Sequence, residues 1–223
     1  MVSAERHGES DLVVRIDGTE PISADNAAAV TALCDRADDR DAPGLVVVHV
    51  SGAPGPSWPD GLTVGLVNKW ERALRRLERL DRVTVGVASG DCGGTALDAL
   101  LATDVRIATP ATRLLLPEAG GATWPGMALY RLTRETGTAR FRLAALLGVP
   151  IEAAEAHAAA LLDELADDPA GALAELAATA ASLPRGEPAI RRRLVFDAST
   201  VPFEEALGAH LAACDRALRR SVS

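Results

Sequence analysis

Two short β-branched runs constrain the fold of this chain more than any other feature. Residues 45–50 read LVVVHV and residues 83–88 read VTVGVA. Short, continuously apolar runs of this kind are typical of strands that are buried on both faces, as in parallel sheets. A helical pattern lies between them over residues 64–80, where apolar side chains recur on one helix face. This alternation of strand and helix predicts an α/β fold.

The flanking segments extend the same pattern. Residues 11–17 predict a further strand, and Ser23 is a suitable N-cap for the helix after it, since its hydroxyl can accept an amide hydrogen bond. The segment SGDCGG at 89–94 predicts a glycine-rich turn that opens directly into a helix. Short strands are expected at 104–108 and 113–118.

The chain is expected to be nearly all helical from about residue 127. Two helical stretches are predicted within 144–165, an alanine-rich helix at 169–182 and a final amphipathic helix at 202–220. The cluster Arg191–Arg193 is open to two interpretations, a contact with ligand phosphates or a solvated helix face.

Composition excludes several classes of function. The net charge of −8 argues against a general nucleic-acid binder. The sequence contains no stretch of about 18 uninterrupted apolar residues, so we expect no membrane span. The polar N-terminus lacks the pattern of a secretory signal. Cys34, Cys92 and Cys214 have no disulfide or zinc-site spacing, so we expect no metal site and a reducing, cytoplasmic setting.

Two segments together resemble the enoyl-CoA hydratase/isomerase family, the crotonases. In residues 82–108, the glycines of the 89–94 turn and the later Asp104-Val105-Arg106-Ile107-Ala108 follow the family's register without a gap. In residues 114–132, the match is carried by Pro117-Glu118, Gly120 and Pro125-Gly126. The resemblance implies a crotonase-type ββα-repeat core, as in the ClpP/crotonase fold, over residues 1–165. It implies a helical C-terminal region over residues 166–223, for oligomerisation or pocket closure.

The resemblance also implies a thioester site with two backbone donors. In the family, two N–H groups stabilise the negative oxygen of an acyl-CoA thioester. Here they fall on the amides of Thr95, beside Gly94, and Leu62, after Gly61. Trp58 and Trp124 flank this predicted pocket. An ordinary tight turn with a capped helix remains the alternative interpretation.

Glu118 and Asp98 are the predicted catalytic residues, because the family's hydratases place a glutamate at each position. A carboxyl group in an apolar cleft can transfer protons near neutral pH. Asp98 is one methylene shorter than the family residue, and it has a solvated helix position as its alternative interpretation. Leu62-Thr63, Thr95-Ala96 and Met127–Leu129 also depart from the family pattern, which makes ordinary fatty-acid hydration doubtful.

The short chain is similar to the small accessory crotonase-like members of dihydroxyphenylacetyl-CoA biosynthesis, a route to the dihydroxyphenylglycine of glycopeptide-type antibiotics. That similarity implies a hydratase/dehydratase acting on an acyl- or polyketidyl-CoA, without a tightly bound cofactor, beside a type III polyketide synthase. The alternative is a catalytically weak or inactive crotonase-fold subunit that binds or stabilises the synthase. A serine protease of this general fold is disfavoured, because no serine has a nucleophile-like setting. The family resemblance further implies a homotrimer or hexamer.

Overall fold

The computed structural model describes residues 12–41, 43–137 and 139–221. A seven-stranded sheet forms its centre, in the order β1-β2-β3-β4-β9, with β5 paired to β3 and to β8. β8 is antiparallel to β5, and the other pairs in this sheet are parallel. The strands of the sheet are β1 (Val13–Asp17), β2 (Val46–Gly52), β3 (Thr84–Gly93), β4 (Val105–Ala108), β5 (Arg113–Leu115), β8 (Ile151–Glu152) and β9 (Glu164–Leu165). A separate hairpin consists of β6 (Glu118–Ala119) and β7 (Ala122–Thr123).

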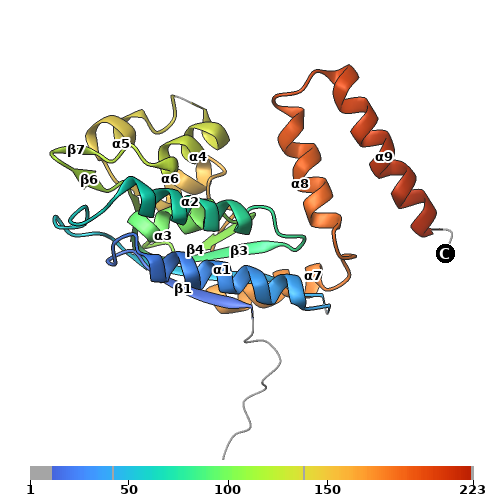
Figure 1. The fold of residues 1–223 in the computed structure, drawn as a ribbon, viewed down its shortest axis with the longest axis horizontal. Coiled ribbons are helices and arrows are strands. Elements are labelled where there is room, and N and C mark those ends of the chain that lie inside the picture. Colours follow the sequence, from blue (N-terminus) through green and yellow to red (C-terminus); the bar gives the residue numbers. More distant parts are fainter. Residues whose placement is uncertain (1–11, 42, 138, 222–223) are drawn as a thin grey trace, which may run out of the picture.

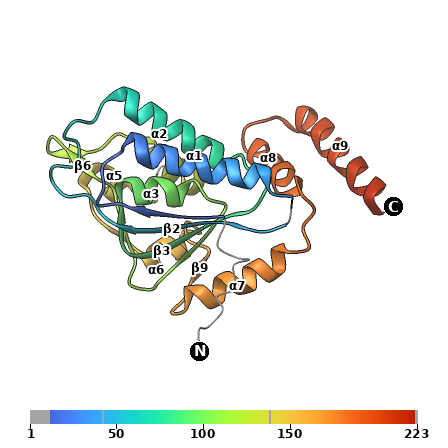
Figure 2. The same ribbon diagram turned by 60° about the horizontal axis from the view of Figure 1, so that its bottom comes forward.

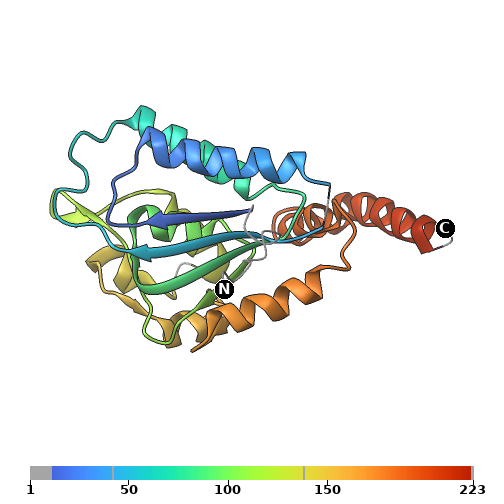
Figure 3. The same ribbon diagram turned by 90° about the horizontal axis from the view of Figure 1, so that it is seen from below.

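Helices cover both faces of the sheet (Figure 3). The sheet separates α1 and α2 from α7, which packs on the other face against Val47, Val85 and Ile107. The α8–α9 hairpin extends away from the body (Figures 1 and 2). The helices are α1 (Ala24–Asp39), α2 (Val64–Leu77), α3 (Gly94–Leu101), α4 (Met127–Thr136), α5 (Arg142–Leu147), α6 (Ala153–Ala158), α7 (Pro169–Ala180), α8 (Glu187–Ala198) and α9 (Phe203–Ser221).

The predicted α/β architecture is confirmed. The two β-branched runs are neighbouring parallel strands, β2 and β3, and α2 lies between them in the chain. Ser23 caps α1 as expected: its hydroxyl accepts a hydrogen bond from the amide of Asn26 at 3.1 Å. Among the described helices, none is long and apolar enough to cross a bilayer.

Two local predictions were wrong. The segment 89–94 is not a simple turn, because β3 continues to Gly93 and pairs there with β5. Gly90, with φ at +64°, takes a left-handed conformation within this strand. The second helical stretch predicted within 144–165 is shorter than expected, because Ile151–Glu152 form β8 and residues 161–165 are not helical. α6 ends at Ala158, Ala160 has a φ of +56°, and the chain then joins the sheet as β9 beside β4. Tertiary pairing overrides the helical propensity of the alanine-rich sequence here.

Arg106 ties the end of α3 to its surroundings. It lies on β4 and is 5% exposed. Its guanidinium donates to the carbonyl oxygens of Leu100, Leu101 and Thr103 and forms an ion pair with Glu135 of α4. A buried cation satisfied in this way fixes α3 against β4 and α4. Arg106 therefore holds the C-terminal end of α3 in place, at the opposite end of this helix from Gly94.

Candidate acyl-CoA site

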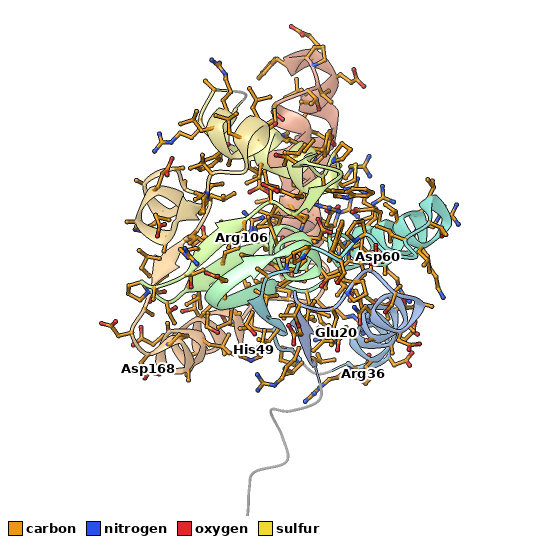
Figure 4. The ribbon with its side chains drawn as sticks, turned by 90° about the vertical axis from the view of Figure 1, so that its left-hand side faces the viewer. Glu20, Arg36, His49, Asp60, Arg106 and Asp168 are labelled. Atoms are coloured by element: carbon orange, nitrogen blue, oxygen red, sulfur yellow. The ribbon has the colours of Figure 1, made fainter. Side chains whose placement is uncertain are left out.

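Three segments meet at the carboxyl-terminal end of the parallel strands. They are the loop after β2, the junction of β3 and α3, and the β6–β7 hairpin (Figures 1 and 3). Figure 4 views the molecule from this end. Glu20 and Asp60 lie there on the side of the sheet away from Asp168, which precedes α7. Ligand sites of open α/β sheets are commonly found at this end.

The start of α3 presents main-chain amides without a side-chain cap. Gly93 is the N-cap and provides no capping hydrogen bond. Gly94 has a φ of +53°, which favours glycine. The Thr95 hydroxyl donates to the carbonyl oxygens of Asp17 and Glu20, at 3.1 and 3.3 Å, and so ties the helix to the end of β1. The Thr95 amide lies in the first helical turn, where amides have no intrahelical acceptor.

Trp58 and Trp124 lie together beside this helix start. Their rings are 5.3 Å apart between centroids in an edge-to-face arrangement. A Cβ atom added to Gly94 would lie 3.1 Å from Trp58 Nε1 and 3.2 Å from Pro54 Cγ, so a larger residue would fit there only if these side chains moved slightly. The structure thus brings together three of the predicted pocket residues with the first turn of α3.

The loop that carries Leu62 has its own hydrogen bond. Gly61 has a φ of +73°, and a Cβ there would meet open space. The Leu62 amide donates to the carbonyl oxygen of Pro59 at 3.1 Å. For this amide to serve a ligand, the turn bond to Pro59 must be released or shared.

Asp98 lies in the interior, between α3 and α2. It is 8% exposed, and the indole Nε1–H of Trp70 donates to its Oδ2 at 3.1 Å. Burial raises the pKa of Asp98 to about 7, and the negative charge of Glu71 acts in the same direction. The charge of Arg131 and the Trp70 hydrogen bond lower the pKa by smaller amounts. Asp98 is therefore able to exchange a proton near neutral pH, and it is not the solvated helix position of the alternative interpretation.

Glu118 has different surroundings. It lies on β6 opposite Thr123, and its side chain is exposed in the single chain. The Trp124 amide donates to the carbonyl oxygen of Pro117 at 2.7 Å, which closes the hairpin next to Glu118. The carboxyl group reaches towards the end of α5, where a Cβ on Gly148 would lie 2.9 Å from its Oε1. Asp98 faces α2, whereas Glu118 faces α5.

Sequence reasoning missed the partners of Asp98. Trp70 lies in the helical pattern of residues 64–80, and its spacing there carries no signal of a hydrogen bond to Asp98 on α3. Arg131, 7% exposed, pairs with Glu71 at 2.8 Å and with Glu78 at 2.7 Å, and so places a cation near Asp98. These contacts join α2, α3 and α4, which the sequence pattern does not relate to one another.

A wide groove lies elsewhere, at the C-terminal end of α3. It has a volume of about 950 Å³ and is lined by residues of α2, α4 and α8, among them Tyr130 and Phe196. Arg191 and Arg192 both line this groove. The Arg192 guanidinium pairs with Asp104 and donates to the carbonyl oxygens of Leu80 and Arg82.

Comparison with known proteins identifies the family. The chain is 57% identical over 213 residues to an enoyl-CoA hydratase of Amycolatopsis orientalis, covering 96% of this chain and 98% of the relative. No family model matches the chain. The chain belongs to the enoyl-CoA hydratase/isomerase family, the crotonases.

Solved structures share the fold at low sequence identity. An enoyl-CoA hydratase/isomerase family protein from Silicibacter pomeroyi superimposes with a TM-score of 0.80 at 19% identity, covering 95% of this chain and 96% of that one. A protein from Thermobifida fusca, described as a putative enoyl-CoA hydratase in complex with acetoacetyl-CoA, has a TM-score of 0.71 at 18% identity, covering 94% and 92%. These likenesses support the crotonase fold of the chain.

Proposed function

We propose that the protein is an enoyl-CoA hydratase/dehydratase-like enzyme that acts on an acyl- or polyketidyl-CoA thioester. One observation carries the proposal: a buried carboxyl group that titrates near neutral pH, Asp98, lies one helical turn after the uncapped amides at the start of α3. Membership of the crotonase family and the 57% identical relative described as an enoyl-CoA hydratase support the same reaction class. Coenzyme A enters as part of the substrate, and no tightly bound cofactor is required.

The proposed chemistry passes through a negatively charged thioester oxygen. In hydration, the oxygen of water bonds to the β-carbon and a proton is added to the α-carbon. Dehydration reverses both steps and releases water. In hydration, the electrons of the C=C double bond move onto the thioester oxygen, and in dehydration the electrons of the α-carbon's C–H bond do so. In both directions main-chain amides at the start of α3 stabilise this negative oxygen. Glu118, assisted by Asp98, would transfer the protons.

We further propose that the substrate is a polyketide thioester made by a type III polyketide synthase, on the route to dihydroxyphenylacetyl-CoA. The support is the set of departures from the family pattern at Leu62-Thr63, Thr95-Ala96 and Met127–Leu129, which would reshape the acyl pocket. A cytoplasmic setting agrees with the thiols: Cys34, Cys92 and Cys214 are all free.

A second candidate is a subunit that binds the synthase without catalysis. Two observations favour it. Glu118 is exposed and has no ion-pair partner among the described residues, and the Leu62 amide is already bonded to Pro59. A fold retained as a platform would tolerate both features.

The experiment that decides between these functions uses mass spectrometry. The protein is incubated in D₂O with a panel of acyl- and polyketidyl-CoA thioesters, with and without a type III polyketide synthase. The enzyme function predicts deuterium at the α-carbon and a mass change of 18 for gain or loss of light water, corrected for incorporated deuterium. Glu118→Gln is expected to slow both at least 100-fold. Full product formation by Glu118→Gln would instead favour the binding subunit.

We also propose that the chain assembles as a homotrimer or hexamer through its C-terminal helices. The apolar face of α9 supports this, because Phe203, Leu207, Leu211 and Leu218 are all exposed in the single chain. Leu207→Asp together with Leu211→Asp is expected to convert the assembly to monomers in sedimentation. Wild-type protein that sediments as a monomer would contradict the proposal.

A further inference from the structure

The wide groove between α2, α4 and α8, which we call the α8 groove, lies outside the proposed thioester site. It is at the C-terminal end of α3, whereas the thioester site is at the start of this helix. Its volume of about 950 Å³ is within the range of small-molecule sites. Arginines outnumber carboxylates among its lining residues, although the whole chain has a net charge of −8. The groove is therefore a candidate site for an anion.

The carboxylates that line the α8 groove all have bonded partners. Four form ion pairs with arginines of the same groove, and the fifth accepts a hydrogen bond from a main-chain amide. These carboxylates are Glu71, Glu78, Asp104, Glu135 and, with the amide, Asp163. Arg131 pairs with two of them, yet its enclosed Nη1 has no acceptor among the described residues. Donors are therefore in excess in these walls.

Two further arginines of the groove have no carboxylate partner. Arg72 on α2 and Arg134 on α4 are exposed, and neither forms an ion pair with a described residue. The Arg134 guanidinium lies over the Phe196 ring, 3.1 Å from its centroid, and this stacking holds the cation against α8. Arg191 on α8 makes a long pair with Glu187, at 3.5 Å. Three helices thus each present a cation to the groove that is weakly paired or unpaired.

An anion with several acceptor oxygens matches these cations. A guanidinium group binds phosphate oxygens bidentately. A single carboxylate has too few oxygens for cations from three helices, whereas a diphosphate presents several. Tyr130, 53% exposed, lies one turn before Arg134 on the same face of α4. Its ring, beside the apolar side chains of Met127 and Val195 in the same groove, suits the stacking of a planar base.

We propose that the α8 groove binds a nucleoside diphosphate at a site separate from that of the acyl-CoA thioester. Arg72 and Arg134 bind the phosphates, Arg191 adds a third cation, and Tyr130 stacks on the base. Because Arg72, Arg134 and Tyr130 are exposed, a ligand reaches them without movement of the chain. The inference goes beyond the proposed function and does not rest on it.

The first test changes the charge of the groove. Binding of ADP and of inorganic pyrophosphate is measured by calorimetry at fixed ionic strength, without added divalent cations. Arg72→Gln and Arg134→Gln are each expected to weaken both ligands about tenfold in Kd. Arg15→Gln removes the same charge from an exposed position on β1 that does not line the groove, and it should change either Kd less than about twofold.

The second test separates the base from the phosphates. Tyr130→Ala removes the ring and leaves the arginines in place, so it should weaken ADP about tenfold and pyrophosphate less than about twofold. Equal weakening of the two ligands, or of neither, would contradict the role of Tyr130 and with it the choice of a nucleoside diphosphate.

The third test asks whether the site is separate. Saturating ADP is expected to change the Kd of butyryl-CoA less than about twofold, because the two ligands occupy opposite ends of α3. Displacement of ADP by butyryl-CoA would overturn the proposal, since the nucleotide end of coenzyme A would then occupy the ADP site.

Two other results would also overturn it: no binding of ADP at about 1 mM, or a loss of affinity in Arg15→Gln as large as in Arg72→Gln and Arg134→Gln. Each of these results leaves the proposed function standing. Wild-type protein that binds ADP as expected, but neither binds nor converts a CoA thioester, would support the α8 groove as a nucleotide site while the proposed function fails.

Discussion

Helix α3 and the α8–α9 hairpin are held in the molecule in opposite ways. All eight residues of α3 are buried, and its ends are tied to β1 by Thr95 and to β4 and α4 by Arg106. In α9, between Phe203 and Arg220, no residue is buried in the single chain. The hairpin meets the body through the Arg192–Asp104 ion pair and the stacking of Arg134 on Phe196, 3.1 Å from the ring centroid.

The difference shows which part of the molecule is held firmly in position. The proposed proton transfer and oxyanion binding would need groups fixed to within a fraction of an ångström, and burial of all of its residues holds α3 firmly in place. The hairpin has few contacts to fix its position, and its apolar face is free to pack on another surface. Stability should therefore depend strongly on the contacts of α3 and only slightly on those of the hairpin.

The largest effect is expected for Arg106→Ala. It leaves the buried ends of α3 and α4 without their shared cation, and we expect a loss of about 3–5 kcal/mol in the free energy of unfolding. Chemical denaturation measures it. Arg113→Ala removes an exposed pair with Asp91 and serves as the control, with an expected loss below about 1 kcal/mol. Equal losses of unfolding free energy in Arg106→Ala and Arg113→Ala would show that stability does not depend more on the contacts of α3 than on exposed ion pairs.

Asp98→Asn is expected to change how stability depends on pH. Burial raises the pKa of Asp98 from 3.8 to about 7. The folded state therefore binds more protons than the unfolded state between these values, and Asp98 makes folding less favourable as pH rises from about 4 to 7.

Denaturation at pH 4 and pH 8 checks this expectation. Asp98→Asn should gain a few kcal/mol in unfolding free energy relative to wild type at pH 8, and little at pH 4. If the difference in unfolding free energy between Asp98→Asn and wild type is the same at pH 4 and pH 8, the pKa of Asp98 is not raised in the folded protein.

Arg192→Ala is expected to release the hairpin while leaving α3 intact. The Arg192 guanidinium joins α8 to Asp104 and to two main-chain carbonyls, and we expect a loss of about 1–2 kcal/mol. Hydrogen exchange should become faster in α8 and α9 and remain unchanged in α3. Faster exchange throughout the chain would show that the hairpin is part of the same cooperative unit.

The smallest effect is expected within α9. Asp215 and Arg219 form an exposed pair one helical turn apart at 2.8 Å. Asp215→Ala should cost about 0.3–0.5 kcal/mol or less, measured as thermal unfolding. A much larger loss would indicate that this surface is covered by another chain in solution, and would sharpen the case for assembly through α9.

The order of elements follows from local patterns in the sequence. The β-branched runs, the helix cap at Ser23 and the glycine at position 94 each reflect interactions within a few residues, so each was predictable. Residues 161–165 were not, because their pairing with β4 depends on a strand more than fifty positions earlier.

The site divides in the same way. The sequence by itself determined which residues lie at the start of α3 and which residue follows Pro117, because each of these positions is defined by its neighbours along the chain. Only the tertiary structure decided that Trp70 bonds to Asp98 and that the Trp58 N–H lies over Gly94 without a partner among the described residues. Hydrogen-bond partners and burial, and with them the raised pKa of Asp98, arise from which side chains meet in space, and most of these partners lie far apart along the chain.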